Sequence, residues 1–162
     1  IAMCYYNLTP RSPLDQKYTR KAIEELQAFV EYYPKDEHAP DAEAKIRELN
    51  GLLAQRLYET ALLYMKLEYY KSATIYFNTV TEKYHDTEFA EPALLGKVRT
   101  LIIRKRYTEA KQNIEKFFER FPRSTQTQDA ESLRNEIDEQ LKKSSSAIGS
   151  PLGRGVEEYQ HA

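Results

Sequence analysis

The sequence predicts an all-α protein, a solenoid of antiparallel helix hairpins, and three observations support this fold class. The 162 residues include only five glycines, three of which (Gly149, Gly153 and Gly155) lie in the last fourteen positions. The rest of the chain is rich in Glu, Lys, Leu, Ala and Tyr, a composition typical of helices. Apolar residues also recur at helical spacings, and these recurrences form a repeat along the chain.

The repeat is a register of small and apolar residues that occurs three times. An alanine is followed by apolar residues four and then three positions later, and by a proline or histidine after five more. An aromatic residue directly precedes this last position and is expected to fill the joint to the next hairpin. Another alanine stands eight residues after the proline or histidine. Spacings of four and three share one helical face, and proline stops a helix. The copies are Ala22, Leu26, Phe29, Tyr33, Pro34 and Ala42; Ala73, Phe77, Val80, Tyr84, His85 and Ala93; and Ala110, Ile114, Phe117, Phe121, Pro122 and Ala130.

These positions match the tetratricopeptide repeat (TPR). Tyr70 and Tyr107 each stand three residues before the first alanine of a copy, at the turn between paired helices. Ala73 and Ala110 are 37 residues apart, close to the TPR period of about 34 residues. Ala22 and Ala73 are 51 residues apart, which predicts a first helix in the middle repeat that is several turns longer than the standard one.

The elements follow in order along the chain. Residues 1–7 are expected to be the end of a helix that begins before this sequence, and a loop with Pro10 and Pro13 follows. The last helix is expected to cap the solenoid with a polar outer side. Asp36, Thr87 and Ser124 stand where helix N-caps are expected. The further helices are predicted over residues 14–33, 40–66, 70–84, 88–104, 107–121 and 125–143, so that 1–143 form the repeat domain and 144–162 a Ser/Gly-rich tail or a linker left by cloning.

Composition and motifs favour a binding protein over an enzyme. With 24 basic and 25 acidic residues, the chain has no cationic surplus for nucleic acid. Cys4 is the only cysteine, so no internal disulfide and no cysteine-based zinc site can form. His38, His85 and His161 lie far apart, and no glycine-rich phosphate loop occurs. We therefore predict no catalytic residue, metal site or cofactor.

The candidate protein-binding residues lie at two helix turns. Arg104, Lys105 and Arg106 form a basic cluster near a helix C-terminus. Cations there also compensate the terminal carbonyls, so a structural role is the alternative to partner binding for this cluster. Tyr64 and Tyr70 are expected at packing positions, and Tyr69 and Tyr76 are expected to be exposed, as interface tyrosines often are. Partial burial between hairpins is the alternative for each tyrosine. The predicted binding residues are Tyr69, Tyr70, Lys71, Tyr76, Arg104, Lys105 and Arg106.

The order of these features resembles the BamD family, TPR lipoproteins of the outer-membrane β-barrel assembly (BAM) machinery. The resemblance covers residues 1–143 and corresponds to the C-terminal half of that family. It rests on Arg11-Ser12-Pro13, Phe29-Val30-Glu31-Tyr32-Tyr33-Pro34, Asp41-Ala42-Glu43-Ala44-Lys45, the long helix from Arg47-Glu48-Leu49 to Tyr64, and Thr81-Glu82-Lys83-Tyr84-His85-Asp86-Thr87.

The resemblance implies a protein-interaction scaffold at the periplasmic face of the Gram-negative outer membrane. Its partners would be the POTRA domains of the barrel-forming subunit and other accessory lipoproteins, and it would help to insert β-barrel proteins. The lipid anchor, the only membrane contact implied, and the repeats that receive substrates would lie outside this sequence.

Other TPR proteins are the alternatives. A periplasmic scaffold that coordinates the cell envelope or cell division is one, although the 51-residue separation disfavours it. A co-chaperone that clamps a terminal carboxylate is another, but Arg56, Leu57, Thr60, Ala93, Leu94 and Lys97 do not supply the required Lys and Asn pattern. A generic TPR adaptor is the third.

Overall fold

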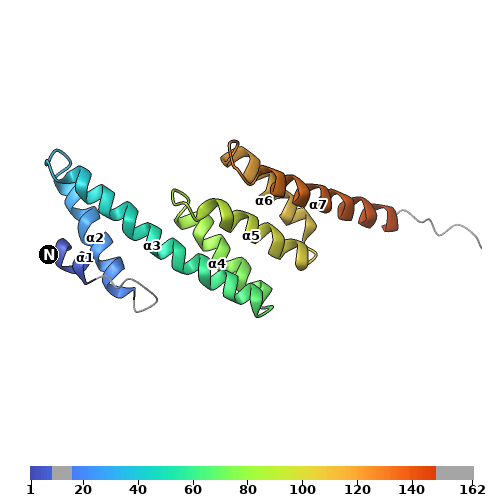
Figure 1. The fold of residues 1–162 in the computed structure, drawn as a ribbon, viewed down its shortest axis with the longest axis horizontal. Helices are drawn as coiled ribbons and strands as arrows, with labels where there is room; N and C mark the ends of the chain where they lie inside the picture. The colour runs from blue at the N-terminus through green and yellow to red at the C-terminus, as the bar shows by residue number, and fades with distance from the viewer. Residues whose placement is uncertain (9–15, 149–162) are drawn as a thin grey trace, which may run out of the picture.

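The computed structural model describes residues 1–8 and 16–148, and the side chains of this range up to residue 146. Within these residues the secondary structure is entirely helical, so the predicted fold class is confirmed. Each helix packs mainly against its neighbours in sequence, which produces the row of hairpins in Figure 1. The helices are α1 (Ala2–Asn7), α2 (Lys17–Tyr32), α3 (Ala39–Lys66), α4 (Tyr70–Lys83), α5 (Ala90–Ile103), α6 (Tyr107–Arg120) and α7 (Thr127–Ile148).

The long helix of the middle repeat is α3, with 28 residues, or about 42 Å at the helical rise. Its N-terminal part, up to Leu53, contributes Ala42, Leu49 and Leu53 to a core shared with α2. Its second half contributes Ala54 and Ala61 to a separate core shared with α4. The longer spacing between the first two repeat copies therefore reflects one helix that serves two cores in succession.

The third core lies between α5, α6 and α7. Ala130, Leu133 and Ile137 of α7 are buried against α5 and α6, while Glu131 and Glu139 of the same helix are exposed. An amphipathic last helix of this kind covers the apolar face that the final hairpin would otherwise leave open. The predicted capping helix is thus confirmed.

Two boundaries differ from the prediction by three residues or more. Helix α7 ends at Ile148, not at residue 143. The Ser144 and Ser146 hydroxyls donate to the carbonyls of Leu141 and Lys142 at 2.8 and 3.0 Å, so these serines are accommodated within the helix. Helix α2 begins at Lys17. The loop over residues 9–15, and the tail from residue 149 onward, lie outside the described residues.

The residues expected as N-caps form turns instead. The N-cap positions of α3 and α5 are occupied by His38 and Phe89. In all three copies, the amide of the expected cap residue donates to the carbonyl of the aromatic residue three positions earlier, at 3.1 Å. The pairs are Asp36 to Tyr33, Thr87 to Tyr84 and Ser124 to Phe121. Each of these residues closes a recurring turn three positions before the first residue of the next helix.

The aromatic residue that precedes each of these turns was expected to fill the joint to the next hairpin. Tyr84 packs against both the first and the second core, and Phe121 packs against the third. For Tyr33 the expectation was wrong, because its side chain is 61% exposed and its ring lies against Phe29 of the preceding helix, α2, with centroids 5.7 Å apart. The α2–α3 turn lies at the outer end of the molecule (Figure 1), where α4 does not cover it.

Candidate protein-interaction surface

The α3–α4 and α5–α6 turns have the same backbone geometry. Glu68 and Lys105 adopt left-handed conformations, with φ of 62° and 57°. In the first turn the amides of Glu68 and Tyr69 donate to Met65 and Tyr64, at 3.0 and 2.9 Å. In the second turn, the amides of Lys105 and Arg106 donate to the carbonyls of Ile102 and Leu101, at 2.8 and 2.9 Å. This is the Schellman arrangement, which satisfies the last carbonyls of a helix.

The two turns lie at the same edge of the solenoid (Figure 1). Arg104 Nη1 donates to Thr74 Oγ1 of α4 at 3.2 Å. The Thr74 hydroxyl in turn donates to the carbonyl of Tyr70 at 2.8 Å. The structure therefore joins the two predicted groups into one surface through a contact between residues that are 30 positions apart along the chain. We call it the turn edge and define it as residues 67–71, 74–76 and 103–106.

The cations of the turn edge differ in their surroundings. Lys71 and Lys105 are exposed. Arg106 forms an ion pair with Glu109, and Arg104 is half-buried beside Thr74. Because backbone amides already satisfy the final carbonyls of α5, Lys105 is not required for this purpose. Its charge is therefore available to a partner.

The tyrosines of the turn edge form a small stack. Tyr69 is 62% exposed, as expected, and Tyr70 is half-buried. Tyr76 was expected to be exposed, but it is half-buried because its ring stacks on Tyr64 of α3, with centroids 5.3 Å apart. Tyr64 also meets the edge of Tyr69 at 6.3 Å. Tyr76 therefore supports the exposed Tyr69 through Tyr64 more than it offers a surface of its own.

The sequence interpretation missed the apolar part of this surface. Ile75 is 62% exposed, and Leu67 and Ile103 are exposed beside the two turns. Leu62 and Leu63 are exposed on the last turns of α3. One signal could have identified this last pair, since residues 61–65 are all apolar and one helical face cannot bury five consecutive residues. Exposed apolar residues gathered in this way mark interaction sites.

Chemically, the turn edge offers aromatic and aliphatic area, with lysines and arginines around it. Among residues 1–8 and 16–148, His, Cys, Asp and Glu form no group of three or more suited to holding a metal ion. No helix in the described part of the chain has the length and apolarity to span a membrane. Apolar and aromatic contacts flanked by charge are the composition of protein–protein interfaces.

The fold and this surface define the class of protein, a TPR-type helical solenoid with a surface suited to protein binding. Comparison with known proteins identifies its family. Residues 2–104 match the YfiO family model, described as outer membrane lipoprotein. The outer membrane protein assembly factor BamD of Caulobacter vibrioides is 30% identical over 112 residues, which make up 69% of this chain and 37% of that protein.

The chain belongs to the BamD (YfiO) family of outer-membrane lipoproteins, in agreement with the resemblance found in the sequence. This places it at the periplasmic face of the outer membrane. The match takes in α1 to α5 and thus most of the turn edge. The chain spans little more than a third of the length of its Caulobacter relative.

Proposed function

We propose that this chain acts in outer-membrane protein assembly as a docking module whose turn edge binds the POTRA domains of the barrel-forming subunit. The named role of the Caulobacter relative supports the general function. The observation that carries the proposed site is the contact between Arg104 and Thr74, which unites two turns into one surface. Other accessory lipoproteins are further candidate partners of the same module.

The composition of the turn edge suits this role. Burial of Tyr69 and Ile75, both 62% exposed in the free chain, would supply apolar contact area, which usually provides most of the affinity of an interface. The surrounding cations would accelerate association and select an acidic partner surface. The proposal requires no catalytic step in this chain.

A calorimetric titration tests the docking site directly. The 162-residue chain is titrated with purified POTRA domains from the same organism, at low and at high salt concentration. We expect saturable binding that weakens at high salt, because screening reduces attraction between exposed charges. The double substitution Arg104→Ala with Arg106→Ala should lower the affinity and flatten the salt dependence. Arg123→Ala with Lys142→Ala removes two exposed cations elsewhere and serves as the matched control.

Lys105→Gly separates binding from folding. Glycine relieves the left-handed strain at this position, which amounts to about 1 kcal/mol, so the variant should be more stable than the parent chain while it binds POTRA domains less tightly. Absence of binding by the parent chain at high micromolar concentrations would overturn the docking proposal. Equal affinity and equal salt dependence for all variants would overturn the assignment to the turn edge.

A further inference from the structure

The long helix α3 leaves a cleft between α2 and α4. Helix α2 packs along the first half of α3 and α4 along its second half, so the two shorter helices diverge. The cleft between them has a volume of about 450 Å³, within the range of ligand pockets. Leu53 and Leu57 of α3 line its floor, Arg20 of α2 lies on one wall and Lys83 of α4 on the other.

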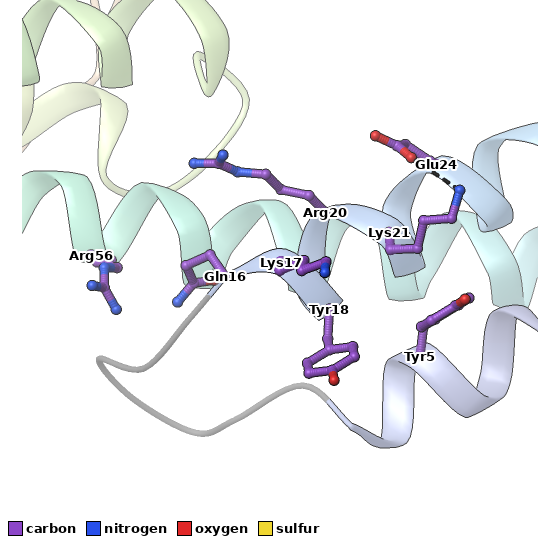
Figure 2. Close-up of a pocket in the computed structure, with 8 residues that line it drawn as sticks. All are labelled: Tyr5, Gln16, Lys17, Tyr18, Arg20, Lys21, Glu24 and Arg56. Atoms are coloured by element: carbon purple, nitrogen blue, oxygen red, sulfur yellow. Dashed lines mark hydrogen bonds and ion pairs between the residues drawn. The ribbon is translucent and has the colours of Figure 1, made fainter.

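A second hollow of about 770 Å³ adjoins this cleft. It lies between α1, α2 and α3, and it shares Arg20 and Glu24 with the first. Figure 2 shows the side chains of Tyr5 and Tyr18 on its α1 side, and Arg20 extending from α2 over α3. The two hollows therefore form one open trough, which suits an extended chain better than a compact small molecule.

The charges of the trough are mainly positive. Arg20 and Lys83 are exposed on opposite walls of the cleft, and Lys17 and Arg56 line the adjoining hollow. Glu24 is an acidic residue of the lining, and it accepts a hydrogen bond from Lys21 at 3.5 Å. Hydrogen bonds to Glu25 and Glu24 raise the pKa of Lys21, and these two carboxylates balance its charge, so Arg20 and Lys83 carry the charge that faces a ligand. An acidic ligand is therefore favoured.

We propose that this trough binds an extended acidic segment of a partner protein. Its carboxylates contact Arg20 and Lys83, and one of its apolar side chains enters the cleft above Leu53 and Leu57. A nucleic acid fits less well, because the chain has a net charge of −1 and no surplus of cations to replace phosphate counterions. Lys83 is the last residue of α4, whereas the turn edge surrounds the first turn of the same helix. The two ends of α4 are about 20 Å apart. The trough is thus a second surface, and the proposal is independent of POTRA docking.

Fluorescence anisotropy with short labelled peptides tests the trough. The probe alternates Glu with Ser and carries one central Leu; two comparison peptides have Lys for Glu or Ser for Leu. We expect saturable binding of the Glu peptide to the 162-residue chain, and weaker binding of both comparison peptides. Arg20→Glu with Lys83→Glu should weaken binding about tenfold or more. Arg123→Glu with Lys142→Glu changes the net charge equally and should leave binding unchanged.

Asn50→Trp provides a variant that keeps the charge. Asn50 lines the cleft and is half-buried, so an indole there should fill the cleft and block the Leu side chain of the probe. Circular dichroism verifies that each variant is folded. The proposal would be overturned if the Glu peptide still binds both the Asn50→Trp variant and the Arg20→Glu, Lys83→Glu variant. It would also be overturned if the Lys peptide binds as tightly as the Glu peptide.

Two further measurements distinguish other occupants. The first is binding to vesicles of phosphatidylglycerol and phosphatidylcholine. If the chain binds these vesicles through Arg20 and Lys83 but does not bind the peptide, the trough contacts a lipid surface and the proposal is overturned. Sedimentation could instead show that the chain dimerises and that Arg20→Glu with Lys83→Glu abolishes the dimer. A second copy of the chain would then occupy the trough, and the proposal would be overturned. The reversal should leave POTRA affinity unchanged, so a failure of the trough and a failure of the turn edge can be told apart.

Discussion

Gly96 lies within α5 against the ring of Phe77, a residue of α4 whose side chain is completely buried. A Cβ at position 96 would lie 2.5 Å from Cζ and 2.7 Å from Cε1 of that ring, closer than van der Waals contact permits. Because Phe77 is enclosed by the second core, its ring cannot move aside without displacing other side chains. At this position the absence of a side chain sets how closely α4 and α5 approach.

Gly96→Ala should therefore destabilise the protein, by about 1–3 kcal/mol as for other overpacked sites, in spite of the higher helix propensity of alanine. Gly51→Ala is the matched control, because within the described residues a Cβ at position 51 meets open space. That substitution should stabilise the helix by up to about 1 kcal/mol. Urea unfolding measures both free energies, and a Gly96→Ala variant as stable as Gly51→Ala would contradict the packing argument.

Helix α7 shows what a terminal element contributes to a solenoid. Its residues Ala130 and Ile137 are completely buried in the third core, beside Ile114 and Phe117 of α6. Arg134 also lies over the ring of Phe118, with its guanidinium carbon 5.0 Å from the centroid. The helix covers apolar area that the α5–α6 hairpin cannot cover by itself.

Truncation tests this role. A chain that ends at Arg123 lacks α7 and should expose Ile114 and Phe117, so we expect a lower melting temperature and aggregation in size-exclusion chromatography. A chain that ends at Ile148 retains the whole helix and should remain monomeric with unchanged stability. The interpretation of α7 as a cap fails if the shorter chain is monomeric and as stable as the longer one.

At the scale of the whole molecule, three consecutive cores are coupled through shared elements. Helix α3 belongs to the first two cores, and Tyr84 packs against both. In a solenoid each unit contacts only its neighbours, so coupling between neighbours determines whether the molecule unfolds as one unit. Tyr84 occupies the joint at which the long α3 separates α2 from α4.

Tyr84→Ala should weaken this coupling. We expect a loss of about 2 kcal/mol and a shallower urea dependence, because the first core can then unfold separately from the second. Tyr33→Ala changes the corresponding residue of the first repeat copy, which is 61% exposed, and should have an effect below about 0.5 kcal/mol. Equal effects of the two substitutions would show that Tyr84 does not couple the cores.

The sequence alone determined the helices, the repeat register, the long α3 and the capping α7. These features depend on spacings of three, four, 37 and 51 residues, which one linear chain displays directly. The alanines of the register, Ala22, Ala73 and Ala110, are all completely buried. The family also followed from the order of motifs along the chain, and the comparisons confirm it.

Only the tertiary structure decided which distant residues meet. The contact between Arg104 and Thr74, the stacking of Tyr76 on Tyr64, and the trough walled by Arg20 and Lys83 each join residues from different helices. Their geometry depends on how far α4 is displaced along α3, and no local pattern encodes that displacement. Sequence periodicity therefore predicts which face of each helix is buried, whereas the packing of the helices determines which exposed faces combine into a binding surface.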